Sequence, residues 1–146
     1  MKRCFPIVVC SLALLTSLPA DGGGGPRNDV RFGVMTHFAH GWDPALIPSV
    51  ARSGVRTVRD ELYWRDVEPR KGVFVFPGQY ENTMAALARE GIEPLIILSF
   101  ENDAYDGGNT PNSDDGIGGF ARYAGQVVRR YGGQVKAVEV WNEYNG

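Results

Sequence analysis

Short apolar runs alternate with amphipathic stretches along most of the chain. Four runs have the length and composition of β-strands, over residues 31–36, 55–60, 94–100 and 135–141. Between them, apolar residues at helical spacing predict three helices, over residues 44–52, 80–90 and 120–131. This alternation of strands and helices predicts βαβ units and a parallel sheet.

The connection after the first strand separates two parallel architectures. A doubly wound dinucleotide-binding sheet would place a glycine-rich phosphate loop there, whereas residues 36–44 are aromatic and polar. We therefore expect an α/β fold that corresponds to the N-terminal part, about four βα units, of a (β/α)8 TIM barrel. A complete barrel needs about 250 residues. We accordingly expect this 146-residue chain to be truncated, with residues 30–146 forming the N-terminal half of the barrel.

The N-terminus has a basic start, an apolar run and small residues at its end. Lys2 and Arg3 precede the apolar residues 5–15, and this layout predicts a signal peptide over residues 1–20. The apolar run is shorter than the roughly 20 residues that span a bilayer. We therefore expect a secreted or periplasmic protein with no stable membrane insertion after processing, although an uncleaved chain would stay tethered. Residues 21–29 include four consecutive glycines and predict a flexible linker.

Composition and charge exclude several classes of function. Both cysteines, Cys4 and Cys10, lie in the predicted signal peptide, so a processed chain would hold neither a disulfide nor a cysteine-ligated metal. The chain has 15 Lys and Arg residues against 17 Asp and Glu residues, a net charge of -2. Loss of Lys2 and Arg3 makes the charge more negative, which disfavours nucleic acid as a partner. We expect no metal and no cofactor.

Aromatic and polar residues gather where the predicted strands end. In a parallel α/β fold the active site forms at the carboxyl ends of the strands. The residues at these ends are His37, Phe38, His40, Trp42, Arg59, Glu61, Tyr63, Trp64, Glu101, Asn102, Tyr105, Asp106, Trp141, Asn142, Glu143 and Tyr144. Aromatic rings pack on the C–H faces of sugars, and amides and carboxylates bind sugar hydroxyls. These strand ends therefore favour a polysaccharide or oligosaccharide substrate, and the alternative is that the aromatic rings only plug a barrel mouth.

The sharpest motif is Trp141-Asn142-Glu143, which directly follows the fourth predicted strand. A glycosidase needs a carboxylic acid that stays protonated near the working pH and protonates the departing oxygen. Glu143 is placed for that role, and Asn142 could bind the sugar hydroxyl next to the bond that breaks. A glutamate in a solvated loop is the alternative interpretation.

With these residues the sequence resembles the retaining glycosidases of clan A, whose fourth strand ends in Asn-Glu. Residues 32–38 (FGVMTHF), 54–59 (GVRTVR) and 64–69 (WRDVEP) are most similar to glycoside hydrolase family 39 and related endoglycosidases. The resemblance covers about residues 31–146. It implies hydrolysis of O-glycosidic bonds by a retaining mechanism, with Glu143 as the acid/base and the nucleophile on a seventh strand that this chain does not contain. We therefore expect the chain alone to be inactive.

The resemblance also implies roles for residues on other strands. Arg59 would contact the nucleophile and keep it ionised, since a guanidinium lowers the pKa of a nearby carboxylate. A structural ion pair with Asp60 or Glu61 is the alternative for Arg59. His37 would line the sugar subsite, although a histidine at this position could equally cap a strand. Trp64 and Trp141 complete the predicted substrate-binding set.

Other functions and residues remain open at this point. A non-catalytic carbohydrate-binding remnant would use Trp42, Trp64 and Trp141 as stacking surfaces. A metal-dependent barrel enzyme would need oxygen ligands, and the acidic loop offers Asp103, Asp106, Asp114 and Asp115. These acids lack calcium-loop spacing, which favours a solvated loop. Glu139 shares a strand face with Trp141 and Glu143, and we expect it to be a buried partner or a barrel-interior residue rather than the nucleophile.

Overall fold

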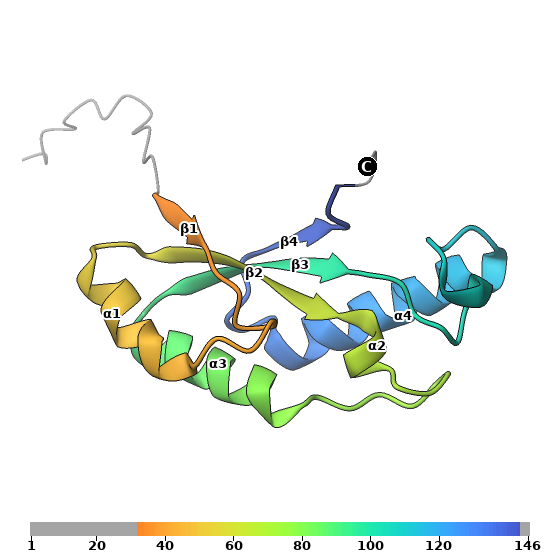
Figure 1. Cartoon of the computed structure of the whole chain (residues 1–146), viewed down its shortest axis with the longest axis horizontal. Coiled ribbons are helices and arrows are strands. Elements are labelled where there is room, and N and C mark those ends of the chain that lie inside the picture. The colour runs from red at the N-terminus through yellow and green to blue at the C-terminus, as the bar shows by residue number, and fades with distance from the viewer. Residues whose placement is uncertain (1–31, 144–146) are drawn as a thin grey trace, which may run out of the picture.

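A computed structural model describes residues 32–143, and its centre is a parallel four-stranded sheet (Figure 1). The strands are β1 (Gly33–Met35), β2 (Thr57–Tyr63), β3 (Glu93–Ser99) and β4 (Ala137–Val140). They lie in sequence order, and every neighbouring pair is parallel. The predicted signal peptide, the whole predicted linker and residues 30–31 of the predicted domain lie outside the described residues.

Helices connect the strands on one side of the sheet. They are the 3-10 turn η1 (Pro44–Leu46) with α1 (Ile47–Arg52), α2 (Trp64–Val67), α3 (Gly78–Arg89), the 3-10 turn η2 (Asp106–Gly108) and α4 (Asp114–Tyr131). Figure 1 shows α1, α3 and α4 below the sheet, with no helix of the described part above it. A doubly wound sheet would carry helices on both faces and would reverse its strand order. The prediction of an α/β fold matching the N-terminal part of a TIM barrel is confirmed.

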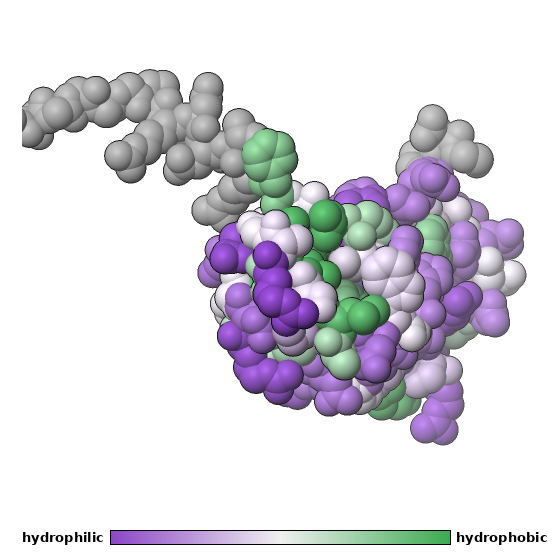
Figure 2. All heavy atoms as spheres, turned by 60° about the vertical axis from the view of Figure 1, so that its left-hand side comes forward, coloured by the Kyte–Doolittle hydropathy of each residue, from purple (hydrophilic) through white to green (hydrophobic). Residues whose placement is uncertain are grey.

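The hydrophobic core lies between the sheet and these helices. Its strand residues alternate, so that Val58, Leu62, Ile96 and Leu98 face the helices and are almost completely buried. The two outer strands of the sheet keep apolar residues in solvent, among them Val34 of β1 and Val140 of β4. Figure 2 shows apolar patches breaking the polar surface on the side of the molecule that carries β1.

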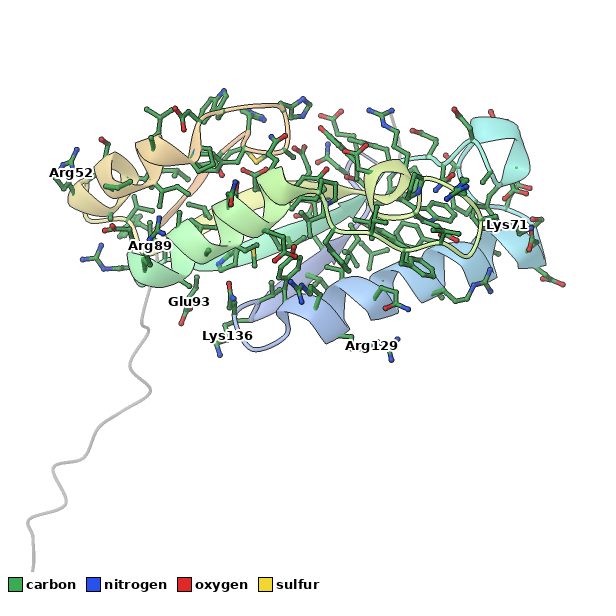
Figure 3. The ribbon with its side chains drawn as sticks, turned by 90° about the horizontal axis from the view of Figure 1, so that it is seen from below. Arg52, Lys71, Arg89, Glu93, Arg129 and Lys136 are labelled. Atoms are coloured by element: carbon green, nitrogen blue, oxygen red, sulfur yellow. The ribbon has the colours of Figure 1, made fainter. Side chains whose placement is uncertain are left out.

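Three of the helices have a basic residue in their last turn. Arg52, Arg89 and Arg129 lie in the last turns of α1, α3 and α4, where a positive charge interacts favourably with the carboxyl end of a helix. Figure 3 shows these three side chains pointing outward from the helical layer. Within residues 32–143, none of the helices is both long and apolar enough to cross a bilayer.

The structure differs most from the sequence prediction in one strand end, one additional helix and one helix start. Strand β2 continues to Tyr63, beyond the predicted end at residue 60, because its polar residues 59, 61 and 63 share the face away from the helices. The short helix α2 lies in a stretch predicted as a loop. Helix α4 begins at Asp114 rather than at residue 120, since the Ser113 side chain caps it by accepting a hydrogen bond from the Gly116 amide at 3.0 Å.

Gly119 allows α4 to approach α2 and the loop after β3. A Cβ atom at this position would lie 2.6 Å from Cε1 of Tyr105 and 3.0 Å from Cζ2 of Trp64. We expect Gly119→Ala to lower the free energy of unfolding by about 1–2 kcal/mol, because overpacking costs about 1–3 kcal/mol and the gain in helix propensity returns at most about 1 kcal/mol. Urea unfolding followed by tryptophan fluorescence measures the change.

Gly125 supplies the matched control, since it lies in the same helix and a Cβ atom there would meet nothing within 4 Å. Gly125→Ala is expected to stabilise the chain by about 0.5–1 kcal/mol through helix propensity alone. Equal stability of the two alanine variants would show that α4 does not pack against Trp64 and Tyr105 as described.

Candidate active site

Arg59 is the centre of a polar network on the face of the sheet opposite the helices. Its Nε donates to Oε2 of Glu139 at 2.8 Å, and its Nη2 donates to Oε1 of Glu139 at 2.7 Å. The same Nη2 donates to Oδ1 of Asn142 at 2.8 Å. Arg59 comes from β2 and Glu139 from β4, and they face each other across β3. The network therefore ties the carboxyl end of β4 to the middle of the sheet.

This geometry decides two of the sequence interpretations. The ion-pair partner of Arg59 is Glu139, so the alternative of a pair with Asp60 or Glu61 is wrong. The sequence predicted Glu139 to be a buried partner or a barrel-interior residue. Glu139 is the partner of Arg59, but its side chain is 37% exposed rather than buried. The hydrogen bonds from Arg59 hold the pKa of Glu139 below its ordinary value, and those bonds in turn raise the pKa of Arg59. Both side chains are charged at neutral pH.

The turn after β4 carries Asn142 and Glu143. The Trp141 amide donates to the Leu98 carbonyl at 3.0 Å and so extends the pairing of β4 with β3. Trp141 has a φ of 67° and Glu143 a φ of 51°, in the left-handed region that non-glycine residues rarely occupy. Strained backbone of this kind gathers at functional sites. The turn leaves the Glu143 side chain in solvent, close enough to Arg59 for its charge to raise the arginine pKa.

The tryptophans of the predicted substrate-binding set occupy different environments. Trp141 is half-buried and its ring packs against Phe100 and Phe120, with centroid distances of 6.1 and 5.8 Å. Trp64 is 0% exposed. Its ring stacks on Tyr105 with centroids 4.7 Å apart, and its Nε1 donates to Oε2 of Glu68 at 2.6 Å. The interpretation of Trp64 as a substrate-binding residue is therefore wrong, because α2 turns the ring into the core.

His37 lies at the end of β1 beside three other polar or aromatic side chains. Its ring makes edge contacts with those of His40 and Trp42, each at a centroid distance of 5.3 Å. Nε2 of His40 lies 3.3 Å from Oε2 of Glu61 and contacts the Tyr63 hydroxyl. Burial and the nearby Glu61 raise the pKa of Tyr63 to about 12, so this hydroxyl keeps its proton. The alternation of Arg59, Glu61 and Tyr63 in β2 was the sequence signal that these side chains share one face.

The acidic loop is occupied by structural contacts. Oδ2 of Asp106 accepts hydrogen bonds from the amides of Asn112 at 2.9 Å and Ser113 at 3.3 Å, and hydrogen bonding lowers the Asp106 pKa. Asp115 pairs with Lys71. Among residues 32–143, the one group of three or more side chains spaced for a metal ion is His37, His40 and Glu61. The alternative of a metal site built from the acidic loop therefore finds no support in the described part of the chain.

No protein-family model and no curated protein matches this sequence. Among solved structures, a family 39 glycoside hydrolase from the gut symbiont Bacteroides cellulosilyticus WH2 matches with a TM-score of 0.70 and 28% identity over 77% of this chain and 24% of that chain. A β-galactosidase from Halorubrum lacusprofundi matches with a TM-score of 0.64 and 19% identity, over 80% of this chain and 22% of that one. A β-glucosidase from Thermotoga maritima matches with a TM-score of 0.56 and 20% identity, over 66% and 23% of the two chains.

The two neighbours at about one-fifth identity support the fold alone. The chain spans about a quarter of the length of each of these three enzymes. In its described part, this protein is similar to the N-terminal part of the TIM-barrel glycoside hydrolases of clan A, which include family 39.

Proposed function

We propose that this chain carries the acid/base part of a retaining glycoside hydrolase site that cleaves O-glycosidic bonds in a polysaccharide or oligosaccharide. The observation that carries the proposal is the network of Arg59, Glu139 and Asn142 directly before Glu143, at the carboxyl end of β4. The similarity to a family 39 glycoside hydrolase at 28% identity supports the same class of reaction.

Glu143 is the proton donor in this proposal. Its carboxyl group is exposed at the end of β4, where a bound sugar could reach it. A general acid must come within hydrogen-bonding distance of the oxygen that it protonates, and an exposed side chain on a turn is free to approach that oxygen. After the leaving group departs, the Glu143 carboxylate would take a proton from the attacking water, as retaining enzymes require of one residue.

Asn142 orients the substrate. Its Oδ1 accepts a hydrogen bond from Arg59, which fixes which end of the side-chain amide is oxygen and which is nitrogen. The NH2 group therefore points away from the guanidinium. That NH2 group can donate to the sugar hydroxyl beside the scissile bond, a hydrogen bond that strengthens in the transition state. Arg59 therefore acts through Asn142, as a positioning residue. The proposal assigns no nucleophile among residues 32–143.

The test is hydrolysis by the complete gene product that contains these residues, assayed against a panel of oligosaccharides and polysaccharides. Glu143→Gln keeps the shape of the side chain but removes its acid, and general acid–base catalysis contributes about 10²–10⁴-fold. We expect kcat to fall by about that factor. Glu90→Gln, an exposed position after α3, is the matched control and should leave kcat unchanged.

Two results would contradict the proposal. If the Glu143→Gln enzyme hydrolyses the same substrate at the rate of the unaltered protein, Glu143 is not the acid. If the unaltered protein binds glycans in the panel but cleaves none of them, the chain belongs to a non-catalytic, carbohydrate-binding remnant of such a barrel. In that case the half-exposed Trp42 and Trp141, rather than Glu143, would carry binding.

A further inference from the structure

Three potential metal ligands meet beside the proposed sugar site. His37, His40 and Glu61 each present one ligand atom, and these atoms all lie within 4.8 Å of one another. We call this group the His–Glu cluster. His37 and His40 come from the turn after β1, and Glu61 comes from β2. Two imidazoles and one carboxylate form a donor set that zinc sites use, with a fourth position left for water or substrate.

Glu61 provides a second observation that points to a ligand. Its side chain is 5% exposed, and its Oε2 atom has no hydrogen-bond partner in the described part of the chain. Nε2 of His40 lies 3.3 Å from this oxygen, but the two atoms do not form a hydrogen bond. A buried carboxylate oxygen without a partner is costly, and metal coordination is one of the ways in which proteins satisfy it.

The backbone around the cluster is fixed before any ligand arrives. The His40 amide donates to the His37 carbonyl at 3.0 Å, which closes a turn and brings the two rings together. The Asp60 carboxylate accepts from the amides of Phe38 and Ala39 at 2.8 and 3.2 Å, between the two histidines. Ligands that are held in place by such supporting hydrogen bonds lose little entropy when they bind a metal.

We propose that the His–Glu cluster binds one divalent transition-metal ion, with Zn²⁺ as the best fit. Imidazole nitrogen favours Zn²⁺ over Mg²⁺ and Ca²⁺, which prefer all-oxygen sites. The ion takes Oε2 of Glu61 and one ring nitrogen from each histidine. The Tyr63 hydroxyl, which contacts Nε2 of His40, places a further oxygen beside the cluster. The His40 side chain is 53% exposed, so the ion can enter from solvent. This proposal does not depend on the proposed hydrolysis.

The experiment is isothermal titration of the full 146-residue chain with ZnCl2. For this titration the two cysteines are replaced, by Cys4→Ser and Cys10→Ser, and no histidine tag is added. These changes remove the other side chains that would bind zinc with high affinity. We expect one Zn²⁺ per chain and no binding of MgCl2 or CaCl2. Glu61→Gln and His40→Gln should each weaken Zn²⁺ binding by at least about tenfold, since even the loss of a supporting residue commonly costs 10- to 100-fold. Asp115→Asn, in the first turn of α4 beside the acidic loop, should leave Zn²⁺ binding unchanged.

A second measurement keeps the proposal testable if Glu61→Gln folds poorly. His40 is exposed, so His40→Gln should retain the circular dichroism spectrum of the unaltered chain. Zn²⁺ should raise the urea midpoint of the unaltered chain, because a ligand that binds only the folded state stabilises it. The midpoint of His40→Gln should not rise. The proposal is overturned if Zn²⁺ shows no saturable one-to-one binding, or if His40→Gln binds Zn²⁺ as tightly as the unaltered chain. It is also overturned if Asp115→Asn loses Zn²⁺ binding, because the site would then lie at the acidic loop.

Discussion

Asp60→Ala is expected to lower the free energy of unfolding by about 3–5 kcal/mol, because each buried donor left without a partner costs about 1–3 kcal/mol. Asp60 is 3% exposed. Its carboxylate accepts from the Thr36 hydroxyl at 2.7 Å and from the amides of Phe38 and Glu61, each at 2.8 Å. These contacts join β2 to the turn after β1, so the substitution leaves several donors buried at once.

Urea unfolding and refolding of the Asp60→Ala and unaltered chains measures this loss of unfolding free energy. Asp115→Ala is the matched control, since Asp115 is exposed and surface substitutions change stability by no more than about 0.5 kcal/mol. Asp60→Asn should lie between the two, because it keeps one acceptor oxygen and turns an NH2 group towards buried donors. If Asp60→Ala unfolds at the same urea concentration as Asp115→Ala, the turn after β1 is not held by Asp60.

The same turn carries His37 and His40, which links stability to the proposed metal site. Asp60 touches neither ring, but it holds the backbone of the two residues between them. A chain with Asp60→Asn that remains folded should therefore bind Zn²⁺ more weakly than the unaltered chain, although it keeps all three ligands of the His–Glu cluster.

The order of strands and helices could be predicted from the sequence because it depends on local patterns. The run from residue 94 to residue 100 reads as a buried strand, and β3 occupies Glu93–Ser99 with Ile96, Ile97 and Leu98 in the interior. The start of α4 was missed because its first five residues include the poor helix formers Asp114, Gly116 and Gly118. The hydrogen bond from the Gly116 amide to the Ser113 side chain offsets this weak helix propensity, and this capping contact is visible only in the structure.

The candidate site was predictable to the extent that strand ends converge. Arg59 was assigned to the end of the second strand, and Asn142 and Glu143 to the end of the fourth. Arg59 lies within β2 rather than at its end, and a hydrogen bond joins it to Asn142. The partner of Arg59 could not be predicted, because Glu139 lies 80 residues away in sequence and depends on the parallel register of β2, β3 and β4. Trp64 was misassigned for a related reason. Sequence position placed it at a strand end, whereas α2 begins at that residue and directs its ring inward.

Glu68, the buried partner of Trp64, gives the second large expected effect. Its side chain is 0% exposed. Oε2 accepts from Trp64 at 2.6 Å, and Oε1 accepts from the Gly72 amide at 2.6 Å and from the Tyr105 hydroxyl at 2.7 Å. Burial and the hydrogen bond to Glu68 together raise the pKa of Tyr105, so this hydroxyl remains a donor. One carboxylate thus satisfies donors from α2, from the loop after it and from the loop after β3.

Glu68→Ala is expected to cost about 4–5 kcal/mol, since it leaves two buried donors, Nε1 of Trp64 and the Tyr105 hydroxyl, without partners and opens a cavity among the rings. Glu90→Ala, at an exposed position, should change stability by no more than about 0.5 kcal/mol. Folded chains commonly have only about 5–15 kcal/mol in total, so Glu68→Ala should unfold at markedly lower urea. Tryptophan fluorescence follows the transition, because Trp64 passes from the core into water. A variant whose urea midpoint matches that of Glu90→Ala would mean that Trp64 and Tyr105 find other acceptors, and that packing of the rings rather than the carboxylate holds α2 against α4.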